Sequence, residues 1–240
     1  MSSLKPSHEL KSNARGYLLG KYTQVVPVQI IYGLAAGSLS MVGSNLSNSK
    51  LLIMSLIGLL ITLLASVLSL LLHYGLCRMY MNLCCGFRFG ASDLFSGFSF
   101  KDDRPVRFSL RLTLAFFLSI LPAAVVCGFA ASFNIKPLLI AASVLLCAGL
   151  ILFYNYYLEL SQCFYLMLDF PDKSLADIMA LSRWLMKGRK LRLFYLQVSF
   201  VPIYLLGWIP CGIGLFWANP YIETTLACFH LNLTSAASEG

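Results

Sequence analysis

Charged side chains are scarce in this chain. They account for 12% of its 240 residues, against roughly 25% in soluble globular domains. Hydrophobic residues make up 58%, and the mean hydropathy is +0.76. This composition excludes an ordinary soluble domain and predicts one all-α, polytopic membrane domain over residues 1–240. The net charge of +8 does not predict nucleic acid as a partner, because basic residues beside membrane helices usually orient the protein in the bilayer.

Sequence motifs that carry chemistry are also absent. The chain has no Gly-x-x-x-x-Gly-Lys-Ser/Thr loop to hold phosphates and no Gly-x-Ser-x-Gly turn to hold a nucleophile. Its eight cysteines include no Cys-x-x-Cys pair, and no two histidines have the spacing of metal ligands. We therefore expect no catalytic residues, no cofactor and no metal ion, and we expect the protein not to be an enzyme.

Long apolar runs dominate the chain instead. A helix needs about 20 mainly apolar residues to cross a bilayer. Four runs in the first two-thirds of the chain reach this length, and they predict membrane spans at residues 22–43, 51–76, 109–132 and 138–162.

The last apolar run, from Leu193 to Leu233, is too long for one span. As a straight helix its roughly 40 residues would reach about 60 Å, twice the roughly 30 Å of a bilayer core. Two spans, at residues 192–209 and 212–230, fit the length better, whereas a single crossing would leave five spans instead of six. The turn is expected in the segment from Gly207 to Gly214, which contains Pro210 and three glycines that weaken a helix.

The basic residues alternate between the loops. Four Lys or Arg precede the first span and one follows it, six lie between the second and third spans, one follows the third, and six follow the fourth. Because Lys and Arg are enriched in cytoplasmic loops, this alternation predicts a cell-membrane protein with a cytoplasmic N-terminus. With six spans the C-terminus would be cytoplasmic as well.

A short amphipathic helix is predicted over residues 174–188. Ser174 is a favourable N-cap, Asp177 is placed to form a weaker version of the capping box, and Gly188 is placed to end the helix. The face expected to be buried comprises Leu175, Ile178, Met179, Ser182, Leu185 and Met186. The segment is too short and too charged to cross a membrane, so a connector packed on the bundle is favoured. A dedicated lipid- or partner-binding helix is the alternative.

Glu223 is the strongest candidate for a functional residue at membrane depth. In the predicted sixth span it falls near the middle of the bilayer, where a charge is expensive. A proline frees a backbone carbonyl in a helix. The candidate polar site comprises Pro220, Tyr221, Glu223 and Thr224. A protonated glutamate that only helps to pack the bundle is the alternative interpretation. No Lys or Arg follows Arg192, so an ionic partner must come from another helix or from a bound ion.

Two other ionisable residues belong to the predicted spans. Glu159 and His73 both fall near the cytoplasmic ends of their helices. We expect both to lie at the membrane interface, because ionisable side chains near a helix end can reach water.

The last quarter of the chain carries a family resemblance. The stretches ALSRWLMKGRKLRLFYLQVSF, GIG and NPYIETTLACFHLNL resemble the end of a bacterial membrane family catalogued as domain of unknown function 975. That family shows Leu-Ser-x-x-x-Met-x-Gly-x-Lys, Leu-Ser-Phe, Gly-Ile-Gly and Pro-Tyr-x-x-Thr-x-x-x-Phe-Tyr patterns. The matching positions are Leu181, Ser182, Met186, Gly188, Lys190, Ser199, Phe200, Gly212, Ile213, Gly214, Pro220, Tyr221, Thr224 or Thr225, and Phe229.

The resemblance extends over nearly the whole chain. The positions similar to the family's opening and to its first cytoplasmic loop are Ala14, Arg15, Gly20, Tyr22 and the segment Asp93 to Phe98, which contains Gly97. Two residues depart from the usual pattern: Val198 stands where Leu is usual, and His230 where Tyr is usual. The resemblance implies an integral membrane protein and supplies no catalytic residues.

Three classes of function are compatible with the sequence. A non-catalytic membrane scaffold or envelope-homeostasis factor fits the missing catalytic motifs. A small transporter or channel would use Glu223 and the broken C-terminal hairpin as its site, since broken helices are common in transporters. A membrane enzyme is the least favoured class. The expected partners are the lipid bilayer and either further copies of the chain or other membrane proteins.

Overall fold

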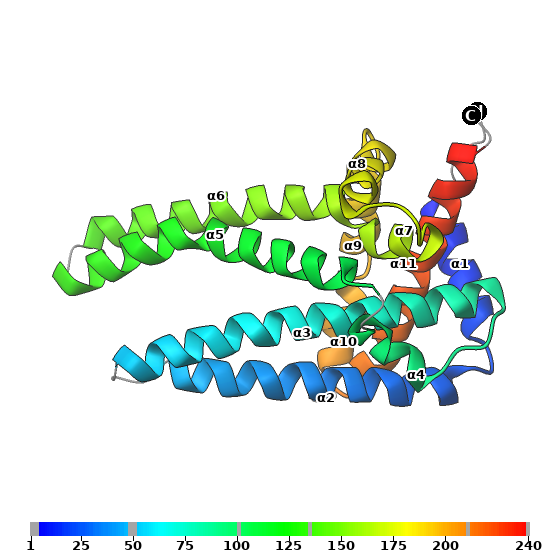
Figure 1. Cartoon of the computed structure of the whole chain (residues 1–240), viewed down its shortest axis with the longest axis horizontal. Helices are drawn as coiled ribbons and strands as arrows, with labels where there is room; N and C mark the ends of the chain where they lie inside the picture. The colour runs from blue at the N-terminus through cyan, green and yellow to red at the C-terminus, as the bar shows by residue number, and fades with distance from the viewer. Residues whose placement is uncertain (1–4, 48–51, 100–101, 134–135, 210–211, 239–240) are drawn as a thin grey trace.

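The computed structural model describes residues 5–47, 52–99, 102–133, 136–209 and 212–238. Within these residues the chain is 87% helical and contains no strand. Two long helical hairpins extend to the same side (Figure 1). The helices of the first arm are α2 (Tyr22–Ser47) and α3 (Leu52–Cys85), and those of the second arm are α5 (Arg104–Phe133) and α6 (Lys136–Leu160). The prediction of an all-α bundle is confirmed.

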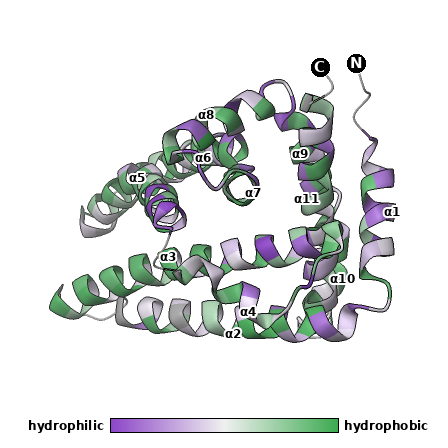
Figure 2. Cartoon of the chain, turned by 45° about the vertical axis from the view of Figure 1, so that its right-hand side comes forward, coloured by the Kyte–Doolittle hydropathy of each residue, from purple (hydrophilic) through white to green (hydrophobic). Residues whose placement is uncertain are grey.

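Shorter helices gather at the other end of the arms and form what we call the base (Figure 1). They are α1 (Ser7–Leu18), α4 (Ala91–Leu94), η1 (Phe95–Phe98), α7 (Cys163–Asp169), α8 (Leu175–Met186), α9 (Lys190–Val198), α10 (Val201–Trp208) and α11 (Leu215–Ser238). Helix α11 contacts α3, and in both views it runs crosswise to that helix (Figures 1 and 2). The arms are mainly apolar, whereas polar side chains concentrate toward the base (Figure 2).

Five helical segments are long and apolar enough to cross a membrane. They are Tyr22–Asn45, Ile53–Cys85, Arg104–Ala130, Pro137–Asp169 and Lys190–Trp208. Helix α11, which holds the expected sixth span, is not among them. Its crosswise course along the base also differs from that of the arms, so the structure does not support the expected sixth span in α11.

The amphipathic helix predicted after Ser174 is α8. The Ser174 side chain accepts a hydrogen bond from the Asp177 backbone N–H at 3.3 Å and donates one to the Asp177 carboxylate at 2.6 Å. The buried residues of α8 are Leu175, Ile178, Met179, Ser182, Leu185 and Met186, the face that its periodicity predicts. This face packs against α6 and α7, which supports the connector interpretation.

The predicted segment at residues 192–209 is broken where a continuous helix was expected. Helix α9 ends at Val198 and α10 begins at Val201. Pro202 lies at the start of α10, where its missing N–H costs least and where it disfavours helical continuity with the residues before it. This proline gives the physical reason for the break.

The turn between α10 and α11 depends on glycine. Gly212 has a φ of +82°, in the left-handed region that side chains disfavour. A Cβ at Gly214 would come within 2.8 Å of the Gly207 Cα, so the two backbones meet directly. The structure thus places a tight turn in the expected segment, although Pro210 lies outside the described residues.

Bulky residues at this turn are expected to prevent its formation. Gly212→Leu combined with Gly214→Leu should cost about 1–2 kcal/mol for the left-handed residue alone, with a further cost for the clash at Gly214. Folded yield in detergent, measured by size-exclusion chromatography, should fall severalfold. Gly128→Leu on α5 is the matched control, because a Cβ there meets nothing within 4 Å. Equal yields for the two proteins would contradict the tight turn.

Candidate functional site

Glu223 meets a partner from the first arm. Its Oε1 lies 4.0 Å from the His73 Nδ1 on α3, a separation too long for a hydrogen bond. Its Oε2 is buried and has no hydrogen-bond partner among the described residues. The side chains of His73 and Glu223 retain only 25% and 18% of their exposure. The pair therefore brings a carboxyl and an imidazole together with polar capacity left unused.

The prediction that His73 falls near the end of its helix is wrong, because α3 continues to Cys85. One turn further along α3, the Cys77 Sγ lies 3.7 Å from the His73 Nε2. Phe164 packs edge-on against the imidazole, with ring centroids 5.9 Å apart. Both ring nitrogens thus have polar neighbours, and the ring is held in one orientation. Glu159, by contrast, lies at the base and pairs with Lys190 at 2.7 Å and Arg183 at 3.7 Å.

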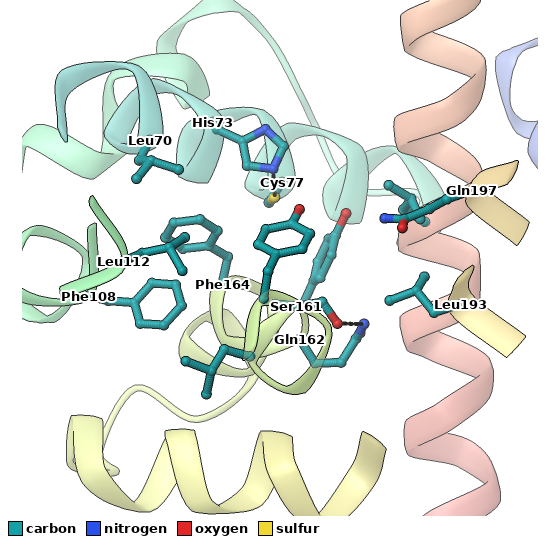
Figure 3. A pocket seen from close by; sticks show the side chains of 14 residues that line it. Leu70, His73, Cys77, Phe108, Leu112, Ser161, Gln162, Phe164, Leu193 and Gln197 are labelled. Carbon is teal, nitrogen blue, oxygen red and sulfur yellow. Dashed lines mark hydrogen bonds between the residues drawn. The ribbon is translucent and has the colours of Figure 1, made fainter. Parts of the chain in front are cut away.

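A small cavity of about 60 Å³ adjoins this pair. His73 and Cys77 line it from α3, and Phe108 and Leu112 line it from α5 (Figure 3). The other labelled polar groups at its edge are Ser161, Gln162 and Gln197 (Figure 3). At roughly 30 Å³ of liquid volume for each water, the cavity has room for about two water molecules. Its size suits water, protons or a small ion better than a metabolite.

The other members of the predicted polar site do not join Glu223. The Thr224 hydroxyl donates to the Pro220 carbonyl of its own helix at 2.7 Å, so it is used inside α11. Tyr221 packs edge-on against Phe200, with ring centroids 5.8 Å apart. Because successive residues turn by about 100° in an α-helix, Tyr221 and Glu223 point to nearly opposite faces. The four residues therefore form two separate environments.

A second buried polar cluster was missed by the sequence interpretation. His230 is fully buried, and its Nδ1 lies 3.0 Å from the Gln162 Oε1 while its Nε2 lies 2.8 Å from the Asp169 Oδ2. The ring also stacks on Tyr165, with centroids 5.0 Å apart. The cluster ties α11 to α7 and to the residue before α7. These residues are more than 60 positions apart in the chain, and no local pattern signals their contact.

The residues that match the family pattern at the base mostly make close packing contacts. The Asp93 Oδ2 accepts a hydrogen bond from the Gly90 N–H at 3.1 Å, which stabilises the start of α4. A Cβ at Gly97 would lie 2.5 Å from the Leu71 carbonyl oxygen, so η1 can approach α3 only because that residue is glycine. These two positions hold the loop between α3 and α5 against α3.

The remaining pattern residues serve turns and helix contacts. The buried Ser182 donates to the Glu159 carbonyl at 2.7 Å and so ties α8 to α6. Gly188 has a φ of +74°, as a helix-ending glycine does. Ser199 donates to the Leu196 carbonyl at 2.5 Å, at the break between α9 and α10. These contacts join helices or end them, and none brings reactive side chains together. They give these family positions a structural role.

The fold and the site define an all-α protein with several membrane-length helices and a polar pair set among them. Residues 1–237 match the family described as "Protein of unknown function (DUF975)", and the chain belongs to that family. No curated protein and no solved structure matches the chain.

Proposed function

We propose that the protein is a non-catalytic scaffold or envelope-homeostasis factor of the cell membrane that assembles with further copies of itself. The second arm carries this proposal. Only 17% of the most apolar window of Arg104–Ala130 and 6% of that of Pro137–Asp169 is buried within the chain. Helices α5 and α6 contact each other closely and diverge from the first arm over most of their length (Figure 1). Lipid or other helices must cover the faces that remain.

The surface of the second arm supports a helix as the cover. An apolar groove of about 350 Å³ runs between α5 and α6, and small side chains let another helix approach its walls closely. The groove is lined by Ile120, Ala123, Ala124, Cys127, Leu139, Ala142, Ser143 and Leu146. Helices α5 and α6 already pack this closely against each other, since a Cβ at Gly149 would lie 2.2 Å from the Ser119 carbonyl oxygen.

Filling the groove is expected to weaken assembly. Ala124→Leu combined with Ser143→Leu places two larger side chains at exposed positions of the groove. The dimer fraction in liposomes, measured by single-molecule photobleaching at increasing lipid dilution, should fall as for a tenfold weaker association, or about 1.4 kcal/mol. Ala141→Leu is the control, because that exposed residue of α6 does not line the groove. A wild-type protein that is monomeric at every dilution would refute self-assembly.

We also propose that both ends of the chain face the cytoplasm, so that the four helices of the arms cross the membrane and the fifth candidate segment, Lys190–Trp208, stays at the base. Helix α1 packs along α11, and the Lys5 backbone N–H donates to the Asn232 Oδ1 at 3.1 Å. Both ends of the described chain thus lie at the base, while the free ends of both arms point the other way (Figure 1). The basic loops also belong to the base, which agrees with an orientation set by Lys and Arg.

Reporter fusions test this orientation. A reporter at the C-terminus and one inserted between Ser99 and Asp103 should both give a cytoplasmic signal, whereas one inserted at Asn48 should give an external signal. An external signal from the C-terminus, with the second reporter still inside, would show that the last apolar run, from α9 to α11, crosses the membrane once.

A small transporter for protons or ions is the second candidate function, and the Glu223–His73 pair favours it. The pair offers two groups that exchange protons, 4.0 Å apart and beside a cavity of about 60 Å³. Ionisable residues at membrane depth often mark proton or ion pathways. Solutes larger than a few water molecules would need a rearrangement of the helices around the cavity.

Proton flux into liposomes separates the two candidates. With a potassium gradient, valinomycin and a pH-sensitive dye inside, a transporter should acidify the lumen faster than empty liposomes. Glu223→Gln should lower this rate at least tenfold, because an amide of the same size cannot exchange the proton. Glu9→Gln, an exposed change on α1, should leave the rate unchanged. A wild-type rate equal to that of empty liposomes would leave the scaffold as the supported function.

A further inference from the structure

A second, larger pocket lies on the opposite side of α11 from Glu223. Its volume is about 500 Å³, within the range of sites for small molecules and cofactors. It lies where α1 and the start of α2 meet the turn between α10 and α11. The lining residues are Arg15, Tyr22, Ile203, Leu206, Gly207, Gly214, Trp217, Ala218 and Tyr221.

The walls of this pocket are apolar toward α10 and α11. Leu206 and Trp217 are more than half exposed, so the pocket opens to the surroundings on a face that suits hydrocarbon. At the edge formed by α1 the character changes, because α1 is a polar helix (Figure 2) and α10 is apolar. A ligand that fills the pocket must therefore combine a polar end with an apolar body.

Arg15 of α1 lines the polar end of the pocket, and Lys11 lies outside the lining, one helical turn before it. The Arg15 guanidinium lies 5.6 Å from the Tyr221 ring centroid, and the Lys11 Nζ lies 4.7 Å from the Phe200 ring centroid. In the described part of the chain, neither cation forms an ion pair with a carboxylate. The two side chains are one helical turn apart, so the charge of Lys11 adds to that of Arg15 beside the pocket.

The electrostatics of these groups favour an anion. Partial burial and the nearby Arg15 charge lower the pKa of Lys11, and a bound anion would reverse that effect. The phenol of Tyr221, and more weakly that of Tyr22, raises the pKa of Arg15, which places both phenols next to the guanidinium. Phenol hydroxyls can donate hydrogen bonds to phosphate oxygens, so the pocket offers donors in addition to charge.

We propose that this pocket binds an anionic phospholipid of the cytoplasmic leaflet. The phosphate contacts Arg15 and Lys11, and one acyl chain lies along Ile203, Leu206 and Trp217. The apolar walls select a lipid over inorganic phosphate, because a free anion would leave them uncovered. Cations near the surface of an anionic leaflet attract its headgroups. The site stands apart from the Glu223 pair, so it rests on the proposed orientation of the base but on neither candidate function.

Trp217 provides a direct probe of occupancy. In a protein with Trp184→Phe and Trp208→Phe, Trp217 remains the only tryptophan. We would reconstitute it in phosphatidylcholine nanodiscs that contain a small fraction of either brominated phosphatidylglycerol or brominated phosphatidylcholine. At equal bromine content, the anionic lipid should quench Trp217 about threefold more strongly, and unlabelled phosphatidylglycerol should reverse the excess quenching.

Variants separate the pocket from the overall charge of the protein. Arg15→Gln combined with Lys11→Gln should abolish the preference for the anionic lipid. Lys187→Gln combined with Arg107→Gln, which removes the same charge from an exposed position directly after α8 and from one in α5, should preserve it. The wild-type preference should also decrease with rising salt, since part of it is electrostatic. If the pocket variant does not fold, this salt dependence of the wild-type protein tests the proposal in its place.

Three results would overturn the proposal. Equal quenching of wild type by the two brominated lipids would show that the pocket does not select anionic lipid. A preference that survives the loss of Arg15 and Lys11 would place the selection elsewhere. Release of the brominated lipid by millimolar inorganic phosphate, with no greater release by unlabelled phosphatidylglycerol, would identify a simple anion site.

Discussion

The packing of α11 across the base is the contact on which the rest of the structure depends. This helix touches α1, α2, α3, α8 and α10, and its Ala227, Phe229 and Leu233 are almost fully buried. Without it, the two arms would share little beyond the contact between α3 and α5. The same packing places the Glu223 carboxyl against α3 and the His230 imidazole against α7, where few water molecules can reach them. Each of these polar groups must therefore find a partner within the protein or in a small cavity.

Close backbone approach explains how the loop between the arms is held. A Cβ at Gly75 would lie 2.0 Å from the Leu94 carbonyl oxygen, so α4 rests directly on the backbone of α3. Between membrane helices, apolar burial gives little advantage over lipid, and fine packing decides which surfaces associate. The glycines thus fix the loop against the first arm, and this contact sets where α5 begins.

Local features of the fold could be predicted from the sequence, and distant contacts could not. The buried face of α8 follows from its own periodicity, and Ser174 marks its start. Pro202 also predicts the break before α10. A continuous helix was expected there because the apolar run is long enough for a membrane span. The proximity of His73 to Glu223 could not be foreseen, because 150 residues separate them and only the crosswise course of α11 brings them together. Tyr221 and Glu223 are two positions apart in one helix, so their side chains point to nearly opposite faces. The helical geometry alone therefore excludes the single polar site that the sequence analysis predicted.

The two faces of α11 have different physical tasks, and this division follows from its position. Glu223 faces the inner cavity and His73, whereas Tyr221 faces α1 and the outer pocket. Pro220 adjoins both faces and removes one backbone hydrogen bond from the helix, so α11 is least rigid where the two environments meet. A change in what covers the outer pocket would therefore act on the same turn that positions Glu223. The arms thus carry the proposed assembly surface, whereas the base, and above all this turn of α11, brings the polar groups of the protein together.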